Sequence, residues 1–378
     1  MSIFKILTFF FAGLLIFVVA FLAFHFKTNA VVTAEEVYRS DEAEQAQRSR
    51  EVFIDIIKKN ATTYAARGAH SKGHACVKAY FDVLESIDPE LQHGIFKIPG
   101  KRYKSWIRFS NGTARADSRD ADKDFRGMAV KLINIYDEDL EKTENSPETQ
   151  DFVMHNHPVF AFDNIEDYNQ FMEQKASLKY FVSGANPFKW RLRELKYLFD
   201  TLAPPPHSPL WDEYFSNTPY KLGPHNIKFS VNSCSSAEFD PGQDKTDPDF
   251  LRKTLAEELK RGTACFNFRV QLQDTDKYMP IEDPSIEWTV SDSPNITIAK
   301  IVIPVQEFNT AGQQAFCENL SFSPWNALPD HRPIGQLNRI RKAAYQASSE
   351  YRHARNQTEI PASLEWCLEG EPDCVMGD

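Results

Sequence analysis

The chain has 378 residues, 42% of them hydrophobic and 25% charged, which is typical of a globular protein and not of a disordered or fibrous one. Its formal net charge of −10 argues against a nucleic-acid partner, because phosphate binding needs a basic surface. The acidic run that begins at Asp137 and continues to Glu148 is interpreted as a solvated loop.

The N-terminus is apolar. Residues 6–26 contain no Asp, Glu, Lys or Arg, and Lys5 and Lys27 flank them. A secretory signal has an apolar stretch of roughly 7–15 residues, whereas a membrane-spanning helix needs about 20. The length therefore predicts a transmembrane anchor within residues 1–30. A long signal peptide, cleaved after Ala30 or Ala34, is the alternative.

Residues 31–50 are polar and helix-prone, which predicts a stalk between the anchor and the body. The positive charges that flank the apolar segment are few and balanced, so they set the orientation poorly. We expect the body to lie on the non-cytoplasmic, periplasmic side.

Several later segments alternate between apolar and polar residues, which predicts strands with one buried face. The alternation is strict in residues 264–273 and is repeated in residues 227–231. Residues 296–305 alternate with a change of phase, which indicates a bulge. Residues 106–110 and 127–135 are also predicted to be strands.

Two helices are predicted among these strands. Asp247 and Pro248 have the residue types of a helix start, and Gly262 is typical of a helix end. The apolar stripe of this helix consists of Leu251, Leu255 and Leu259. A longer helix is predicted over residues 334–355. The fold class is therefore α+β, an antiparallel sheet or β-barrel with added helices.

The six cysteines leave the redox compartment open. Cys367 and Cys374 lie close together in a polar tail and are able to pair. Scattered reduced thiols are an equal alternative.

The late helix carries a candidate metal ligand. Arg341 and Tyr345 are four residues apart and share a helix face, with Arg352 two turns further on. A neighbouring cation favours the phenolate, and a phenolate is one of the axial ligands that proteins use for haem iron. The alternative is an ordinary surface helix with solvated arginines.

His70 is a candidate proton shuttle, since an imidazole can take a proton from a peroxide and return it. A single histidine is more often structural, and nearby His74 competes for the same role.

Five segments resemble the sequence blocks of haem catalases and occur in the order found in that family. They are Arg67-x-x-His70-Ser71-Lys72-Gly73 with Tyr80–Val83, Ile107–Ser110, Asp124–Lys131, Asp151–Phe160, and Arg341-x-x-x-Tyr345 with Arg352. The resemblance implies a catalase-like antiparallel β-barrel in a haem domain of residues 51–356, followed by a tail of residues 357–378. Because the chain lacks the long arms of typical catalases, it is most similar to the small catalase-related branch of peroxidases and lipid-hydroperoxide isomerases.

The resemblance also implies roles. Tyr345 would bind the iron of a b-type haem, with Arg341 as its charge partner. His70 would be the distal acid–base, Ser110 would orient it, and Asn156 would orient the peroxide. Three arginines would bind the haem propionates: Arg67, Arg108 and Arg352. Phe160 would form part of the pocket wall.

The sequence departs from the family at two places. One residue is inserted between Gly73 and Tyr80. The usual pair of asparagines before threonine-proline is replaced by His155-Asn156-His157, and a gapless alignment puts His155 at the functional position. We prefer Asn156 because it keeps the amide chemistry. Alternatively, two histidines on one strand face would form a zinc or copper site.

The expected function is haem-dependent cleavage of a hydroperoxide, as a peroxidase or a catalase, with hydrogen peroxide or a lipid hydroperoxide as substrate. The alternatives are a lipid-hydroperoxide isomerase of the same fold and a non-enzymatic haem or lipid carrier. A homo-oligomer is compatible with the sequence, and the sequence offers no basis for a bound NADPH.

Overall fold

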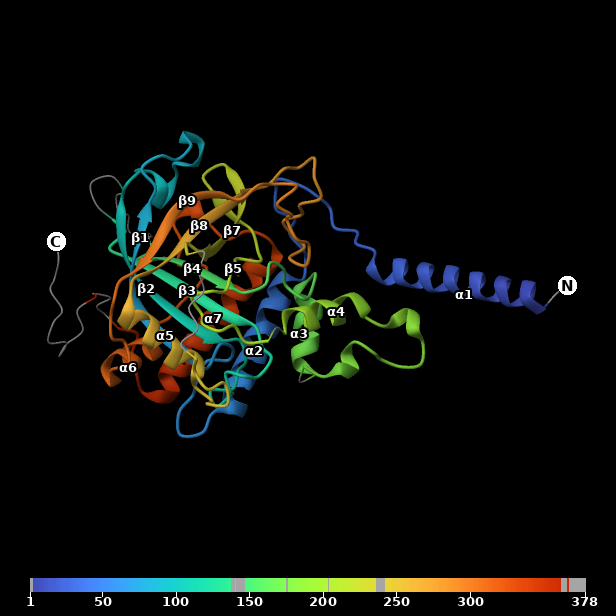
Figure 1. Cartoon of the computed structure of the whole chain (residues 1–378), viewed down its shortest axis with the longest axis horizontal. Coiled ribbons are helices and arrows are strands. Elements are labelled where there is room, and N and C mark those ends of the chain that lie inside the picture. Colours follow the sequence, from blue (N-terminus) through green and yellow to red (C-terminus); the bar gives the residue numbers. More distant parts are fainter. Residues whose placement is uncertain are drawn as a thin grey trace.

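The computed structural model describes residues 3–136, 140, 147–174, 176–202, 204–235, 242–361 and 366; for residues 3–10 it describes the backbone alone. Most of the acidic run, together with Cys367 and Cys374, lies outside these residues. Figure 1 shows a β-sheet body with helices packed against it and helix α1 projecting away from it.

The strands predicted at residues 106–110, 127–135, 227–231, 264–273 and 296–305 and the helices predicted at residues 247–262 and 334–355 are present, together with elements that the sequence did not predict. The helices are α1 (Ile3–Phe26), α2 (Glu42–Asn60), α3 (Ile165–Glu173), α4 (Leu192–Thr201), α5 (Phe250–Arg261), α6 (Ala311–Asn319) and α7 (Gln336–Asn356). The strands are β1 (Gly73–Val83), β2 (Arg102–Asn111), β3 (Arg126–Ile133), β4 (Gln150–His155), β5 (Tyr214–Phe215), β6 (Tyr220–Leu222), β7 (His225–Ser233), β8 (Ala264–Leu272) and β9 (Ile296–Ile303).

The strands form an antiparallel β-barrel. Their order in the sheet is β5-β4-β3-β2-β1-β9-β8-β7-β6, and β5 also pairs with β7, which joins the two sides of the sheet. Strand β6 is attached to β7 outside this ring. The predicted α+β barrel with added helices is therefore confirmed.

The predicted bulge is present between β8 and β9. Phe268 pairs with Ala299, but the next residue, Arg269, pairs with Thr297. One residue of β9 is skipped, which changes the phase of its buried side chains.

Helix α5 begins later than predicted. The structure places its N-cap at Asp249 and its first turn at Phe250, whereas the sequence suggested a start at Asp247 and Pro248. The reason is that the Asp247 carboxylate accepts the backbone N–H of Asp249 at 2.9 Å, which forms a turn before the helix. The predicted end at Gly262 is confirmed, and the leucine stripe is fully buried.

Phenylalanine rings fill the inside of the barrel. The rings of Phe81 and Phe152 lie 5.8 Å apart between centroids, and those of Phe152 and Phe268 lie 4.8 Å apart. Phe229 packs against the same rings. Because these side chains occupy the interior, a ligand site has to lie on the outer face of the barrel or at its rim.

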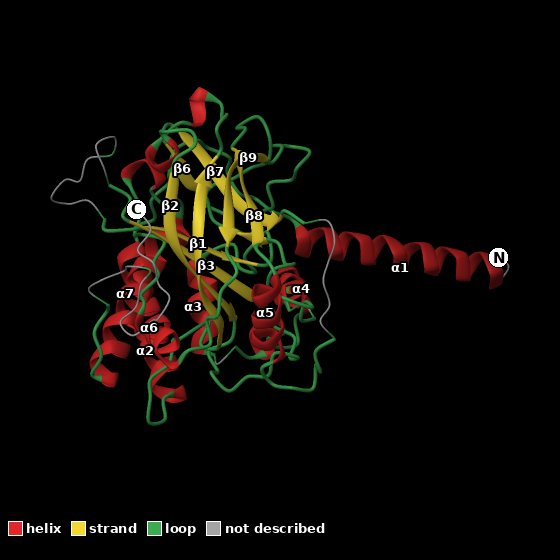
Figure 2. Ribbon diagram, turned by 60° about the vertical axis from the view of Figure 1, so that its left-hand side comes forward, coloured by secondary structure: helices red, strands yellow, loops and turns green. Residues whose placement is uncertain are grey.

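The segment predicted as a stalk is bound to the body. Arg339 of α7 forms ion pairs with Glu36 at 2.7 Å and with Glu42. Helix α2 lies along α7 (Figure 2). Residues 31–50 thus contribute to the packing around α7.

Among the residues whose side chains are described, the structure contains no helix that combines the length and apolarity needed to span a membrane. The anchor expected over residues 6–26 is not supported by this finding.

Candidate active site

His70 lies beside Ser110 on the outer face of the barrel. Its Nδ1 atom is 3.0 Å from Ser110 Oγ. Its ring also covers Gly127, where a side-chain carbon would lie 2.5 Å from Nδ1. Phe109 and Met128, the strand neighbours of Ser110 and Gly127, point into the core. Gly127 therefore gives the imidazole room to lie against the sheet, and the structure brings His70 and Ser110 together.

The environment of His70 keeps its ring neutral. Burial, assisted by the positive charge of Arg108, lowers the pKa of His70 to about 3. At physiological pH the imidazole therefore has one protonated and one unprotonated nitrogen. With Nδ1 bound to Ser110, Nε2 is the atom left to meet a ligand.

His74, the competing candidate, belongs to a different cluster. The pairing of β1 with β2 shifts between Gly73 and Ala75, which makes His74 the extra residue of a β-bulge where the sequence has its insertion. The side chain is 1% exposed. Its Nε2 lies 2.9 Å from Asn111 Oδ1, and its Nδ1 lies 3.6 Å from Asp120. These contacts give it a structural role.

Arg341 and Tyr345 lie on one face of α7. The guanidinium carbon of Arg341 is 5.8 Å from the centroid of the Tyr345 ring. Nη2 of Arg341 donates to the Tyr220 hydroxyl at 2.7 Å. Tyr220, which the sequence did not indicate, therefore holds the arginine beside the candidate ligand.

Phe160 belongs to the apolar surroundings of α7. Its ring packs against Tyr168 with centroids 5.1 Å apart, and both rings contact a buried cluster that includes Leu337 and Ile340 of α7. Burial, and to a smaller extent the nearby Tyr345, raises the pKa of Tyr168. Phe160 therefore packs against a tyrosine that is close enough to Tyr345 for an electrostatic interaction.

The three arginines expected to hold propionates gather around one carboxylate. Arg67 Nη1 is 2.7 Å from Glu318 Oε2, and Arg352 Nη1 is 3.7 Å from Glu318 Oε1. The positive charge of Arg108 also lowers the pKa of Glu318, though less than that of Arg67, and together the arginines outweigh the opposing effect of burial. Glu318 was not identified from the sequence.

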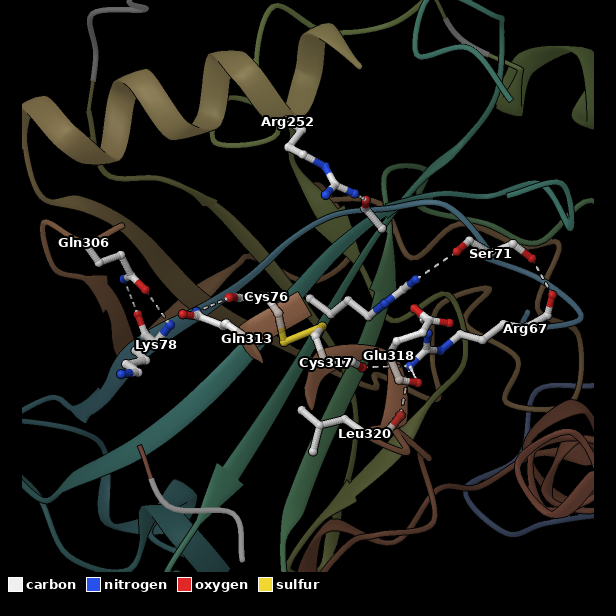
Figure 3. The surroundings of a disulfide bond; sticks show 12 residues. Arg67, Ser71, Cys76, Lys78, Arg252, Gln306, Gln313, Cys317, Glu318 and Leu320 are labelled. Atoms are coloured by element: carbon white, nitrogen blue, oxygen red, sulfur yellow. Dashed lines mark hydrogen bonds and ion pairs between the residues drawn. A yellow bond between two sulfur atoms is a disulfide. The ribbon is translucent and has the colours of Figure 1, made fainter. Parts of the chain in front are cut away.

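A disulfide holds Glu318 in place (Figure 3). Cys317, at the end of α6, is bonded to Cys76 of β1 across 241 residues of sequence. The carbonyls of Cys317, Glu318 and Leu320 accept hydrogen bonds from Arg67 Nη2 at 2.9–3.2 Å. The segment after this disulfide therefore orients Arg67.

A second disulfide joins Cys234, just after β7, to Cys265 of β8. The expectation of scattered reduced thiols is wrong for the four described cysteines. The proposed pair of Cys367 and Cys374 lies outside the described residues.

The Asn156 side chain is hydrogen-bonded to Arg126 and Asp212. The Asn156 side-chain carbonyl accepts the backbone N–H of Arg126 at 2.6 Å, and its amide donates to Asp212 at 3.1 Å. Both polar atoms of the side chain are thus engaged in contacts between loops and strand ends. This arrangement fixes the chain after β4, and neither of these side-chain contacts of Asn156 is with His70.

His155, by contrast, is close to both sides of the candidate site. Burial lowers its pKa well below the usual value, and the next largest contribution comes from His70. Arg341 acts on it in the same direction. His155 thus links the region around His70 with the region around α7.

The structure does not support a metal site at His155 and His157. Strand β4 ends at His155, so the alternation that would put both rings on one face does not continue. The His157 ring contacts its own loop, at 3.2 Å from the Val159 carbonyl. No cluster of three or more His, Cys, Asp or Glu side chains suitable for a metal ion occurs within the described ranges.

The residues present fit a haem. Tyrosinate is a known haem ligand, and arginines bind carboxylates through paired hydrogen bonds. The buried Nε atoms of Arg108 and Arg341 have no hydrogen-bond partner in the described part of the chain. With Glu318, the three arginines carry a net charge of +2, which is opposite to the charge of two propionates.

The chain is similar in sequence to catalases. The catalase family model matches residues 24–183. Catalase of Rattus norvegicus is 25% identical over 323 residues, covering 79% of this chain and 58% of that protein. Catalase-A of Dictyostelium discoideum is 25% identical over 331 residues, covering 80% and 63%. The chain thus spans about three fifths of the length of these relatives.

The fold is similar as well. A fungal catalase structure matches with a TM-score of 0.59 and 18% identity, over 86% of this chain and 65% of that one. Catalase A from Saccharomyces cerevisiae matches with the same score and identity, over 89% and 70%. The family model, the curated relatives and the barrel together support a member of the haem catalase superfamily.

Proposed function

We propose that this protein is a haem-dependent enzyme that cleaves hydroperoxides, with Tyr345 as the proximal ligand of a ferric b-type haem and His70 as the distal acid–base. The observation that carries the proposal is the presence of both groups around one region. His70 is oriented by Ser110 on the barrel, Tyr345 lies beside Arg341 on α7, and both His70 and Arg341 act electrostatically on His155.

The chain's own residues would hold the haem in three ways. Tyr345 would supply the oxygen ligand, and Arg341, fixed by Tyr220, would favour its deprotonated form. The arginine cluster around Glu318, formed by Arg67, Arg108 and Arg352, would bind the propionates, and Phe160 would contribute to the pocket wall. When bound, the haem supplies the electrons that break the O–O bond.

His70 would move the proton. Its neutral ring takes the proton from one oxygen of the hydroperoxide and returns it to the oxygen that leaves, so no net proton is consumed by the chain. The hydrogen bond to Ser110 holds Nδ1, and it thereby directs Nε2 at the substrate. Because burial keeps the ring neutral, it is ready to accept this proton at physiological pH.

We also infer that the body lies in an oxidising compartment, as expected for the non-cytoplasmic side. The Cys76–Cys317 and Cys234–Cys265 disulfides support this location, because such bonds are rare where thiols are kept reduced. Retention of the full chain in carbonate-washed membranes would support the predicted anchor, whereas release of a shortened chain would favour a cleaved signal.

The absorption spectrum of the purified full chain tests the function. We expect bound haem with the spectrum of tyrosinate ligation, and loss of most of this haem in Tyr345→Phe. Arg341→Ala should retain haem with a weakened tyrosinate spectrum. Full haem occupancy and an unchanged spectrum in Tyr345→Phe would contradict the proximal assignment.

A further inference from the structure

Three residues form one row across neighbouring strands of the barrel. Ser110 of β2 pairs with Gly127 of β3, and Gly127 pairs with His155 of β4. Residues directly opposite in a sheet share a face, and adjacent strands are about 4.8 Å apart. The His70 ring lies over Gly127. It is therefore flanked by Ser110 on one side and by His155 on the other.

The strand pattern fixes the face of His155 independently. Phe152 and Met154 of β4 point into the barrel core. The alternation therefore puts Val153 and His155 on the outer face, where His70 lies. Phe125 contacts both imidazoles, with centroids 5.4 Å from His70 and 5.6 Å from His155.

We propose that His155 is the second distal residue of the proposed haem site, so that this enzyme uses two imidazoles where its family uses a histidine and an amide. The inference rests on the proposed function. In this proposal His155, and not Asn156, is the residue that orients the peroxide.

His155 has an atom available for this task. Its Nδ1 is buried and has no hydrogen-bond partner among the residues that the structure describes, although the imidazole also has a side-chain hydrogen bond with Asn217. A buried polar atom without a partner is costly, so a ligand that satisfies it gains that stabilisation. Asn156 has no such spare atom, because Arg126 and Asp212 engage both ends of its amide.

The imidazole would act as a hydrogen-bonding group. In the neutral ring one nitrogen donates and the other accepts, whereas an amide presents a separate carbonyl and NH₂. His155 would donate to the oxygen that leaves while His70 supplies the proton.

Cyanide binding to the ferric haem-loaded protein tests the inference without turnover. Cyanide arrives as HCN, so its affinity depends on distal groups that take up the proton and hydrogen-bond the bound ligand. We expect His155→Phe, which fills the space of the ring, to weaken cyanide binding roughly ten- to a hundredfold. His155→Asn, which restores an amide, should stay within about threefold of the wild type.

The control is His157→Asn, which changes a neighbouring imidazole that contacts its own loop and should leave cyanide affinity unchanged. His155→Leu is a second apolar variant in case His155→Phe does not fold. Unchanged affinity in a folded apolar variant would overturn the role of His155 but leave the haem function intact. Absence of haem from the wild type would overturn both.

Discussion

The Glu318 carboxylate lies 2.7 Å from the Arg67 guanidinium, at the point where Arg108 and Arg352 converge. Burial and the charge of Arg67 lower the pKa of Arg108 to about 9 and that of Arg352 to about 10. Both remain charged at neutral pH, so the cluster has a surplus of positive charge. Glu318 offsets one of the three charges, and two propionates would offset the other two.

Replacing Glu318 by glutamine should therefore destabilise the haem-free protein more than the haem-loaded protein. We expect a loss of about 1–3 kcal/mol in the free energy of unfolding without haem, because buried Arg108 and Arg352 and partly buried Arg67 lose their shared carboxylate. The measurement is denaturant unfolding of both forms. Glu307→Gln, which removes an exposed partner of Lys260, is the control and should change stability by less than about 0.5 kcal/mol.

The same substitution has a defined pH dependence. The arginines outweigh burial and lower the pKa of Glu318 below its usual 4.5. A carboxylate whose pKa is lowered in the folded state contributes its full stabilisation above the unfolded pKa and loses it as pH falls through the folded pKa. The stability difference between wild type and Glu318→Gln should thus be constant above pH 4.5 and shrink below it. An equal difference at every pH would contradict the ion pair.

The two disulfides should differ in their effect on haem retention. Loss of the Cys76–Cys317 bond frees the carbonyls that orient Arg67. The Cys76→Ser/Cys317→Ser variant should therefore transfer its haem to apomyoglobin about tenfold faster than the wild type does. Cys234→Ser/Cys265→Ser is the matched control, because the backbone N–H of Cys234 still bonds the Cys265 carbonyl. Equal rates of haem loss in the two variants would argue against a role in orientation.

His70→Ala should keep the haem but slow hydroperoxide cleavage roughly 10²–10⁴-fold, the usual contribution of acid–base catalysis. Single-turnover spectroscopy with one equivalent of peroxide measures this step. Since burial lowers the pKa of His70 to about 3, the wild-type rate should show no titration of this residue between pH 5 and 8. The comparison variant is His74→Asn; a large loss there, with none in His70→Ala, would exchange the two assignments.

The sequence predicted the strands and the bulge, because these depend on the alternation of apolar and polar residues close together in the chain. Alternation identified β7, β8 and β9, and the phase change located the bulge near Ala299. The family blocks placed His70 three residues before β1 and Ser110 on the neighbouring strand β2, and the structure brings their side chains within 3.0 Å. The alternation of Phe152 and Met154 also indicates that the His155 side chain faces outward. The preference for Asn156 rested on the amide chemistry of that residue and not on this alternation.

Long-range features were not predictable in this way. Glu318 meets Arg67, and Cys317 meets Cys76, only because α6 packs against the barrel. Cysteine spacing does not determine pairing, which is why both described disulfides were missed. The segment of residues 31–50 was assigned to a stalk because its polar residues gave no sign of the ion pairs with Arg339.

We predict that the enzyme is a better peroxidase than catalase. A catalase has to place a second hydrogen peroxide accurately between its distal groups before another donor reacts. In this chain His155 lies opposite Gly127, at the position where the resemblance implies an asparagine. The Asn156 side chain is hydrogen-bonded to Arg126 and Asp212. A displacement of about 1 Å in such a geometry can cost roughly a hundredfold in rate.

The loss should fall mainly on the step that orients the second peroxide, because oxidation of an organic donor at the edge of the site needs less exact placement. Three rates measured on the same preparation distinguish a peroxidase from a catalase. They are oxygen release from hydrogen peroxide alone, oxidation of a phenolic donor, and consumption of a fatty-acid hydroperoxide. His155→Asn should shift the balance toward oxygen release. Rapid oxygen release by the wild type, with negligible turnover of the other two substrates, would show that two imidazoles support the catalase reaction as well as a histidine and an amide do.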